Sequence, residues 1–258
     1  MTFLHVSRQS YHCSVKTKKR APPGPPLTLS AVQEAIIGCE RCPRLRSYCQ
    51  TVAREKRAAY RDWIYWGRPV PGFGDPDARV LILGLAPAAH GANRTGRVFT
   101  GDGAGASGDF LMAALHRAGR ANRTTSQVPD DGLVLRDVYI AAAVRCAPPA
   151  NKPTVEERDT CAPFLARELA LLTEVRVIVA LGQFGWDAGL RALAGLGFEV
   201  RPRPRFGHGA EAALGPYVLL GSYHPSQQNT FTGRLTPPMF AAVLRHAIEL
   251  SGRVSRTD

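Results

Sequence analysis

The stretch RVLILGL, residues 79–85, decides the fold, because an unbroken apolar run of this kind is typical of a strand buried on both faces. Such a strand belongs inside a sheet that has helices on both sides. Three similar runs follow along the chain, and each predicts a further buried strand: DVYIAAAVR (137–145), VRVIVAL (175–181) and YVLLGSY (217–223).

Helical patterns separate these four runs. We expect helices near 107–119, from Thr154 to about 172, after residue 181, and over about 237–251. Thr154 and Glu157 form a capping box at the start of the second of them. The alternation predicts an α/β fold, an open, mainly parallel, four-stranded central sheet flanked by helices on both faces (an α/β/α sandwich). Ligands of such sheets bind beyond the carboxyl ends of the strands.

The N-terminal part of the chain has a different composition. Residues 1–33 contain no Asp or Glu, and the basic run Lys16–Arg20 precedes the proline-rich APPGPP. We predict a flexible or loosely attached basic arm over 1–28, followed by a single domain over 29–258. A solvated tail is favoured over a DNA-binding arm as the interpretation of this segment.

Between the arm and the first strand we expect two helices and a loop. Ser30 and Gln33 offer a capping box for the first helix. The second helix is predicted over roughly 43–66, and PVPGFGDPDA (69–78) reads as loop because of its Pro, Gly and Asp content.

The composition is that of a globular chain with a strong positive charge. Of the 258 residues, 45% are hydrophobic, and 33 basic against 21 acidic residues give a net charge of +12. This favours a phosphate-rich partner or an anionic membrane surface. No apolar run approaches a membrane span, and the N-terminus has no secretory signal, so we expect a cytoplasmic chain with reduced thiols and no membrane partner.

Three polar loops follow the predicted strands: GLAPAAHGANRTGRVFTGDGAG (84–105), CAPPANKPT (146–154) and HPSQQNTFTGR (224–234). Because the carboxyl ends of parallel strands share one edge, the loops should build one pocket. The first loop is neither a P-loop nor a dinucleotide turn. Its Phe99 is either a core anchor or a stacking platform for a planar ligand, and His224 is either structural or functional.

The cysteines are spaced for a metal centre rather than for disulfides. Cys39 and Cys42 form a CxxC pair, Cys146 follows 104 residues later, and Cys161 follows after 15 more. Four thiolates suit zinc or an iron–sulfur cluster, and the wide spacing makes zinc the less natural choice. Cys13 and Cys49 remain as free thiols. A thioredoxin-type redox pair is the alternative, but no βαβ pattern surrounds the CxxC.

Taken together, GLAPAAHGANRTGRVFTGD, HPSQQNTFTGR, the CxxC pair, CAPP and the fourth cysteine strongly resemble the uracil-DNA glycosylase superfamily, over roughly residues 30–250. The nearest match is its family 5 (type-B) branch, whose members carry a [4Fe-4S] cluster. The resemblance implies that Cys39, Cys42, Cys146 and Cys161 ligate this cluster. It implies a monomeric DNA-repair enzyme of a bacterial or archaeal cytoplasm, which flips a damaged base out of double-stranded DNA and hydrolyses its N-glycosidic bond.

The same resemblance assigns roles at the pocket. Phe99 matches the aromatic residue that stacks on the extruded base, and His224 the histidine beside its carbonyl oxygen. Asp102 matches the catalytic acidic residue, and Asn151 a polar residue near the lesion. The wider expectation adds residues that line the base site (Gly84, Leu85, Ala86, Asn93 and Ala142) and residues that contact DNA (Arg94, Arg97, Phe231 and Arg234). Phe231 or Arg234 is the candidate wedge that fills the gap in the duplex.

Two departures from other branches bear on specificity. Leu85 stands where family 4 relatives have an acidic residue, and Ala142 where uracil-specific relatives have an asparagine. Neither side chain can hydrogen-bond a base edge, so the expected substrates are uracil together with hypoxanthine and ethenocytosine. Two other classes of protein stay open: a non-catalytic DNA-binding protein with a structural metal site, and an iron–sulfur electron carrier.

Overall fold

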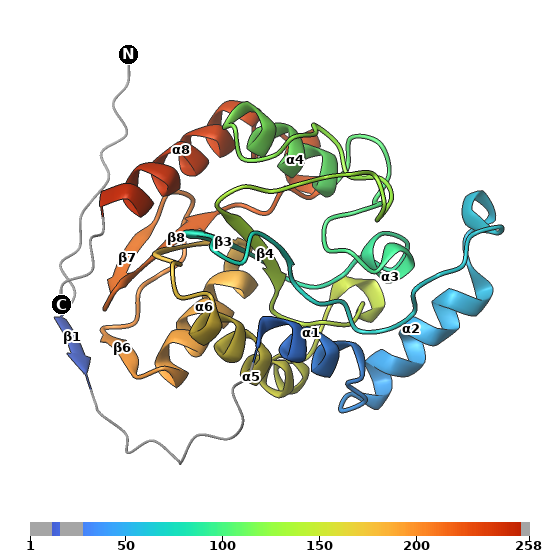
Figure 1. Cartoon of the computed structure of the whole chain (residues 1–258), viewed down its shortest axis with the longest axis horizontal. Helices are drawn as coiled ribbons and strands as arrows, with labels where there is room; N and C mark the ends of the chain where they lie inside the picture. The colour runs from blue at the N-terminus through green and yellow to red at the C-terminus, as the bar shows by residue number, and fades with distance from the viewer. Residues whose placement is uncertain (1–11, 16–27, 254–258) are drawn as a thin grey trace.

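The computed structural model describes residues 12–15 and 28–253 of the chain. Within these residues a six-stranded sheet in the order β2-β4-β3-β5-β8-β7 lies between two layers of helices (Figure 1). The four central strands are parallel, which confirms the α/β class and the expected sheet. They are β3 (Val80–Gly84), β4 (Val138–Ala142), β5 (Val177–Leu181) and β8 (Tyr217–Ser222).

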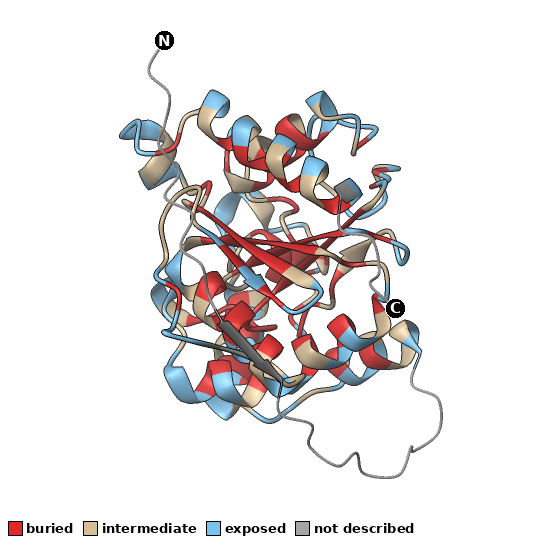
Figure 2. Cartoon of the chain, turned by 90° about the vertical axis from the view of Figure 1, so that its left-hand side faces the viewer, coloured by how far each residue is buried: buried red, intermediate tan, exposed pale blue. Residues whose placement is uncertain are grey.

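The sheet buries both of its faces because successive side chains of a strand point to opposite sides. In β3, Val80 and Ile82 belong to one hydrophobic core, whereas Leu81 and Leu83 belong to the other. Figure 2 shows the buried residues concentrated in the sheet and on the helix sides that face it. This explains why the four strands read as continuous apolar runs rather than as alternating ones.

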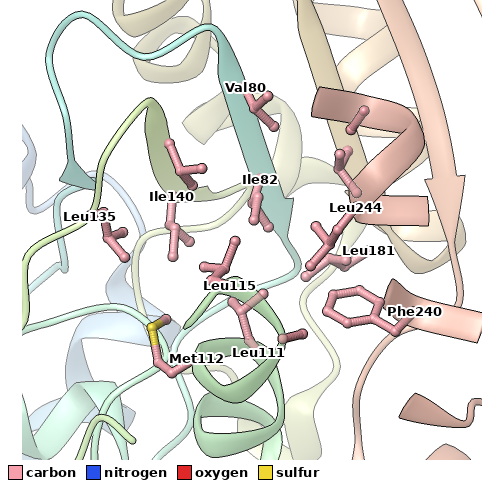
Figure 3. Close-up of a cluster of buried hydrophobic side chains, with 14 of the residues drawn as sticks. Val80, Ile82, Leu111, Met112, Leu115, Leu135, Ile140, Leu181, Phe240 and Leu244 are labelled. Carbon is pink, nitrogen blue, oxygen red and sulfur yellow. The ribbon is translucent and has the colours of Figure 1, made fainter. Parts of the chain in front are cut away.

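Helices cover each core. The first core is closed by α4 (Ser107–Arg117) and α8 (Pro237–Arg253). In Figure 3, Leu111 and Met112 of α4 and Phe240 of α8 lie in the same cluster as Ile82 of β3. The second core is closed by α5 (Val155–Leu171) and α6 (Gly182–Gly195). No helix among the described residues is both long and apolar enough to cross a membrane.

Two short strands at the sheet edges escaped the sequence analysis. β2 (Phe73–Gly74) pairs antiparallel with β4 and lies inside the stretch predicted to be loop. β7 (Glu211–Leu214) pairs antiparallel with β8, and its residues alternate between exposed and buried. Their apolar signals are weak because β2 has two residues and the sequence of β7, EAAL, contains no β-branched or aromatic residue.

A separate two-stranded pairing involves the predicted basic arm. Residues His12–Val15 form β1, which pairs antiparallel with β6 (Phe198–Arg201) outside the main sheet. The rest of the predicted arm, residues 1–11 and 16–27, lies outside the described residues.

The helix ends differ from the expectation at two places. The first helix, α1 (Leu29–Ile37), is capped by Thr28, whose hydroxyl accepts from the Ala31 N–H, so the predicted Ser30–Gln33 capping box is wrong. The second, α2 (Pro43–Glu55), ends eleven residues before 66 because Lys56 has a φ of +57°. By contrast, the capping box at Thr154 is confirmed by both of its hydrogen bonds with Glu157.

A fully buried ion pair joins the end of β4 to α5. The guanidinium of Arg145 donates to both carboxylate oxygens of Glu168, and both side chains are at most 1% exposed. The Tyr139 hydroxyl also donates to Glu168. Because Arg145 directly precedes Cys146, and α5 carries Cys161, the pair fixes the two segments that hold these cysteines.

Candidate active site

The carboxyl ends of the parallel strands open into one cavity of about 460 Å³. All three predicted loops contribute to it. Of the sequence-predicted site residues, the structure brings eight to its wall: Gly84, Leu85, Ala86, Phe99, Asp102, Ala142, Asn151 and His224.

The floor of the cavity is formed where β3 and β4 end side by side. Gly84 is paired with Ala142, and the pairing continues one step further, since the Val144 N–H donates to the Leu85 carbonyl at 3.0 Å. A Cβ on Gly84 would lie 2.9 Å from the Phe99 ring, so the ring rests directly on the backbone there. Phe99 has a φ of +51°, a strained conformation for a non-glycine residue and one found at ligand sites.

His224 lies opposite Phe99. The two rings are stacked, with centroids 6.1 Å apart and planes 26° from parallel. Burial lowers the pKa of His224 to about 4, so the imidazole is neutral at physiological pH. A neutral imidazole can still donate one N–H to an acceptor on a ligand. Its backbone carbonyl accepts from the Asn229 amide at 2.8 Å, which fixes the start of α7 (Gln227–Phe231).

Asp102 carries an ionisable carboxyl group into the same cavity. Its Oδ1 atom is buried and has no hydrogen-bond partner in the protein, although buried carboxylate oxygens are normally paired. Burial, followed by the charge of Asp109, raises the pKa of Asp102 to about 6. A Cβ built on Gly91 would overlap this Oδ1, so the carboxylate lies against bare backbone. The unpaired oxygen is therefore available to a water molecule or a substrate.

A second cavity, of about 240 Å³, shares Ala88, Asp102, Ala150 and Asn151 with the first. Ala150 and Asn151 have φ values of +52° and +56°. Of its remaining wall, Ala89, His90, Gly91 and Pro148 belong to the predicted loops, whereas Tyr48, Arg57 and Tyr60 were missed by the sequence analysis. No local pattern could have found these three, because only the tertiary structure brings their segment to the loops.

Two of the predicted site residues are structural instead. Asn93 is fully buried outside the cavity, where its amide donates to the carbonyls of Cys49 and Ala89. Arg97, predicted to contact DNA, is 7% exposed and forms an ion pair of 2.7 Å with Asp131. It donates further to the Pro129 and Val128 carbonyls. A guanidinium whose donors are committed inside the protein is not free to bind a phosphate, so this prediction is wrong.

Arg94 is likewise buried, at 3% exposure, which contradicts its predicted contact with DNA. Its guanidinium lies between the rings of Tyr60 and Trp63, with its central carbon 4.0 Å from each ring centroid. It also donates to the carbonyls of His90 and Gly101. Arg94 therefore connects the loop that carries Asp102 to the segment after α2.

The two candidate wedge residues are both at the surface. Phe231 ends α7 and is 77% exposed. Arg234 is also exposed, and its guanidinium lies 4.7 Å from the centroid of the Tyr223 ring. Both remain available to a macromolecular partner.

The four predicted ligand cysteines gather on one side of this site, and no described cysteine forms a disulfide. Cys42, Cys146 and Cys161 belong to one buried cluster, and Cys39 packs against the neighbouring one. Burial, then the nearby sulfurs of Cys161 and Cys39, raise the pKa of Cys42 to about 11. Cys49, left over in the sequence analysis, is part of the same cluster.

The donor set fits a soft, thiolate-bound metal centre, since sulfur is the only ligand type in it. Within residues 28–253, however, no three metal-ligating side chains stand in ligand geometry. The neighbouring Cys49 thiol, followed by burial, raises the pKa of Cys146, so this sulfur lies close to a fifth cysteine that is outside the predicted ligand set.

Residues 71–248 match the sequence profile of the Uracil DNA glycosylase superfamily. The chain is 56% identical over 219 residues to the type-5 uracil-DNA glycosylase of Mycobacterium tuberculosis, covering 84% of this chain and 80% of that one. It is 52% identical over 223 residues to the type-5 enzyme of Thermus thermophilus, covering 86% and 98%. The type-4 uracil-DNA glycosylase of Pyrobaculum aerophilum is more distant, at 32% identity over 60% of this chain and 61% of its own.

Proposed function

The chain belongs to the uracil-DNA glycosylase superfamily, and within it to the type-5 uracil-DNA glycosylases, and from this premise we propose that it removes uracil and other damaged bases from double-stranded DNA. Its reaction is the hydrolysis of the N-glycosidic bond, without cleavage of the DNA backbone. We expect it to act as a monomer.

One observation carries this proposal: residues from all three polar loops meet in a single cavity beyond the carboxyl ends of the parallel strands. A base inside a duplex cannot reach such a cavity, so the nucleotide must flip out at a cost of about a few kcal/mol. The partly exposed ring of Phe99, whose backbone has a positive φ, offers a flat surface on which the flipped base stacks. The apolar Leu85 and Ala142 surround the base without selecting one pattern of donors and acceptors.

The chemistry follows from the charges that develop when the C1′–N bond breaks. The bonding electron pair leaves with the base, so the sugar becomes cationic and the base anionic. The Asp102 carboxylate stabilises the cation and orients a water molecule, which adds to C1′ and passes a proton to Asp102. His224 donates an N–H to the base oxygen that gains negative charge, and it does so while neutral because of its low pKa. Asn151 holds the water or the lesion from the shared wall of the two cavities.

A base-release assay tests the proposal. The purified protein should liberate free uracil from a duplex that contains one U, and leave an abasic site that breaks only after alkali treatment. An identical duplex with T in place of U is the control. Duplex binding without release of any base would instead support a DNA-binding protein with a structural metal site. An electron carrier would neither bind nor release.

The proposed breadth of substrates depends on Ala142. This residue is buried at the end of β4 and lines the cavity next to Gly84. Ala142→Asn should lower the release of hypoxanthine relative to uracil by roughly tenfold or more, because analogues then leave a buried amide unpaired. The measurement is single-turnover release from matched uracil, hypoxanthine and ethenocytosine duplexes. An unchanged hypoxanthine-to-uracil ratio would contradict the role given to Ala142.

We further propose that Cys39, Cys42, Cys146 and Cys161 hold a structural [4Fe-4S] cluster. When bound, such a cluster cross-links the N-terminal helices to β4 and α5, closing a loop of over a hundred residues and so stabilising the fold. No step of the base-release reaction needs it, since the cavity residues supply the charge and the hydrogen bonds.

The cluster proposal predicts a brown protein that contains iron and acid-labile sulfide. Cys161→Ala should lose the colour and lower the melting temperature, because it deletes one ligand. Cys49→Ala is the matched control, a buried cysteine of the same cluster of side chains that is not a proposed ligand, and it should keep the colour. A colourless, active protein with stoichiometric zinc would refute the iron assignment.

A further inference from the structure

The segment after α2 begins at the wall of the second cavity. This segment includes the short helix η1 (Ala58–Tyr60). Its residues Arg57 and Tyr60 line that cavity together with Asp102. We call residues 56–66 the projecting segment, because in Figure 1 this light-blue stretch extends past the rest of the molecule at the right-hand edge. Since the two cavities share Asp102 and Asn151, the projecting segment begins next to the proposed base site.

The projecting segment is firmly held at its base. Arg94 lies between Tyr60 and Trp63, 4.0 Å from both ring centroids. The Trp66 N–H donates to the Arg94 carbonyl at 2.9 Å. The Tyr65 hydroxyl is hydrogen-bonded with the His90 ring at 3.1 Å, and so the segment is fixed to the loop that carries Asp102.

The outer surface of the segment combines an apolar side chain with positive charge. Ile64 is 93% exposed, the highest value among the large hydrophobic residues exposed in the described chain. Arg57 and Arg61 are exposed on the same segment beside one exposed acidic residue, Asp62, and Arg54 and Arg68 flank it. One guanidinium nitrogen of Arg61 donates to the Ala58 carbonyl, which holds the side chain near the segment's tip. Cations bind phosphates, and proteins often place branched apolar side chains against base steps in the minor groove.

We infer that the projecting segment is a second DNA-contacting element: Ile64 packs against bases or sugars of the duplex beside the flipped nucleotide, and Arg57 and Arg61 bind its phosphates. Arg94 packs on Tyr60 and Trp63 and so joins the segment to the loop that carries Asp102. This inference rests on the proposed function for its ligand, duplex DNA, but it concerns a surface outside the base cavity.

The test uses two variants with matched controls. Arg61→Ala is compared with Arg136→Ala, and Ile64→Ser with Val134→Ser. Both controls are exposed residues that precede the amino-terminal end of β4, at the opposite edge of the sheet from the site. Binding to an undamaged duplex and to a uracil duplex is measured by fluorescence anisotropy over a range of salt concentrations, and uracil release is measured under single-turnover conditions.

Arg61→Ala should weaken binding and reduce the slope of log affinity against log salt by about one, because one phosphate contact is lost. Ile64→Ser should weaken binding about tenfold, the effect of exposing one buried isoleucine, with the slope unchanged. Both variants should require more enzyme for half-maximal release of uracil, whereas the controls behave like the parent. The melting temperature should stay unchanged in all four, because the substituted side chains lie at the surface.

The inference would be overturned if the Ile64→Ser variant bound both duplexes as tightly as the parent. It would also be overturned if Arg61→Ala left the slope of log affinity against log salt unaltered. Either result would indicate that the projecting segment binds a protein partner instead of DNA. Failure of the proposed function is recognised separately: the parent protein would then release no uracil, whereas the binding comparison on undamaged DNA would still decide the role of the segment.

Discussion

Asp102→Asn should reduce single-turnover release of uracil by about 10²–10³-fold, the usual effect of removing one preorganised electrostatic group. The substitution keeps the shape of the side chain and deletes its charge. A carboxylate that only caps the glycine-rich turn would tolerate this change, since the amide oxygen still accepts hydrogen bonds. The buried Oδ1, however, accepts none within the protein, which favours a role toward substrate or water. Near-normal release by the variant would move the catalytic role to His224 or Asn151.

Asp102 should also set the acid limb of the pH profile. With its pKa raised to about 6, the carboxyl becomes protonated in mildly acid solution, and uracil release falls as the pH drops through this value. His224 stays neutral down to about pH 4 and does not contribute there. Asp109→Asn is the matched control: its carboxylate accepts from the Gln127 amide and the Ser126 N–H, outside the base cavity. Removing its charge should shift the acid limb to lower pH while release at neutral pH persists.

The same carboxyl group affects stability with a defined sign. An aspartate in the unfolded chain has a pKa near 3.8, whereas Asp102 in the fold has one near 6. The folded state therefore binds the proton more tightly, and the fold loses stability as the pH rises through the window between these values. Asp102→Asn should consequently raise the melting temperature at neutral pH. An inactive but stabilised variant is the combination that a catalytic carboxylate predicts and a capping carboxylate does not.

Glu168→Ala should lower the free energy of unfolding by about 3–5 kcal/mol, because it leaves the charge of Arg145 buried and unpaired. Both partners are at most 1% exposed, so water cannot replace the lost carboxylate. In a domain of this size the loss corresponds to a fall of roughly 10 °C in melting temperature. Thermal and denaturant unfolding, followed by circular dichroism, would measure both quantities.

Glu174→Ala provides the comparison for this result. Glu174 pairs with Arg176 at 3.8 Å, and its side chain is 46% exposed. Breaking this pair should cost less than about 1 kcal/mol, because water can replace the exposed carboxylate of Glu174. If the two variants lost similar stability, the buried pair would not be the stabilising contact that its position indicates.

The fold could be predicted from the sequence where the signal is local and continuous. The four central strands lie within a few residues of the apolar runs, because their burial on both faces leaves no room for polar side chains. The edge strands β2 and β7 were missed because their pairing depends on neighbours distant in the chain. The second helix was predicted too long because the aromatic residues at its end, Tyr60 and Trp63, pack on Arg94 rather than along a helix face.

In the site, too, the features with a local sequence signal were predicted, and those fixed by distant contacts were not. The convergence of the loops follows from parallel strand ends, and the cavity lined by Phe99, Asp102 and His224 agrees with it. The three residues that were misplaced, Asn93, Arg94 and Arg97, are polar and lie among true cavity residues, so the sequence offered no reason to separate them. What separates them is burial against partners elsewhere, such as Asp131 for Arg97, and this is fixed only by the tertiary structure.

The close approach of Gly91 to Asp102 limits which residues can occupy position 91. Any side chain at position 91 would displace the carboxylate, since its first carbon would overlap Oδ1, while the surrounding sheet and helices would remain intact. Random mutagenesis followed by selection for defective repair should therefore recover substitutions of Gly91 as folded but inactive proteins, at a position that carries no reactive group. Inherited loss of repair activity can thus arise at a residue that chemical reasoning alone would pass over.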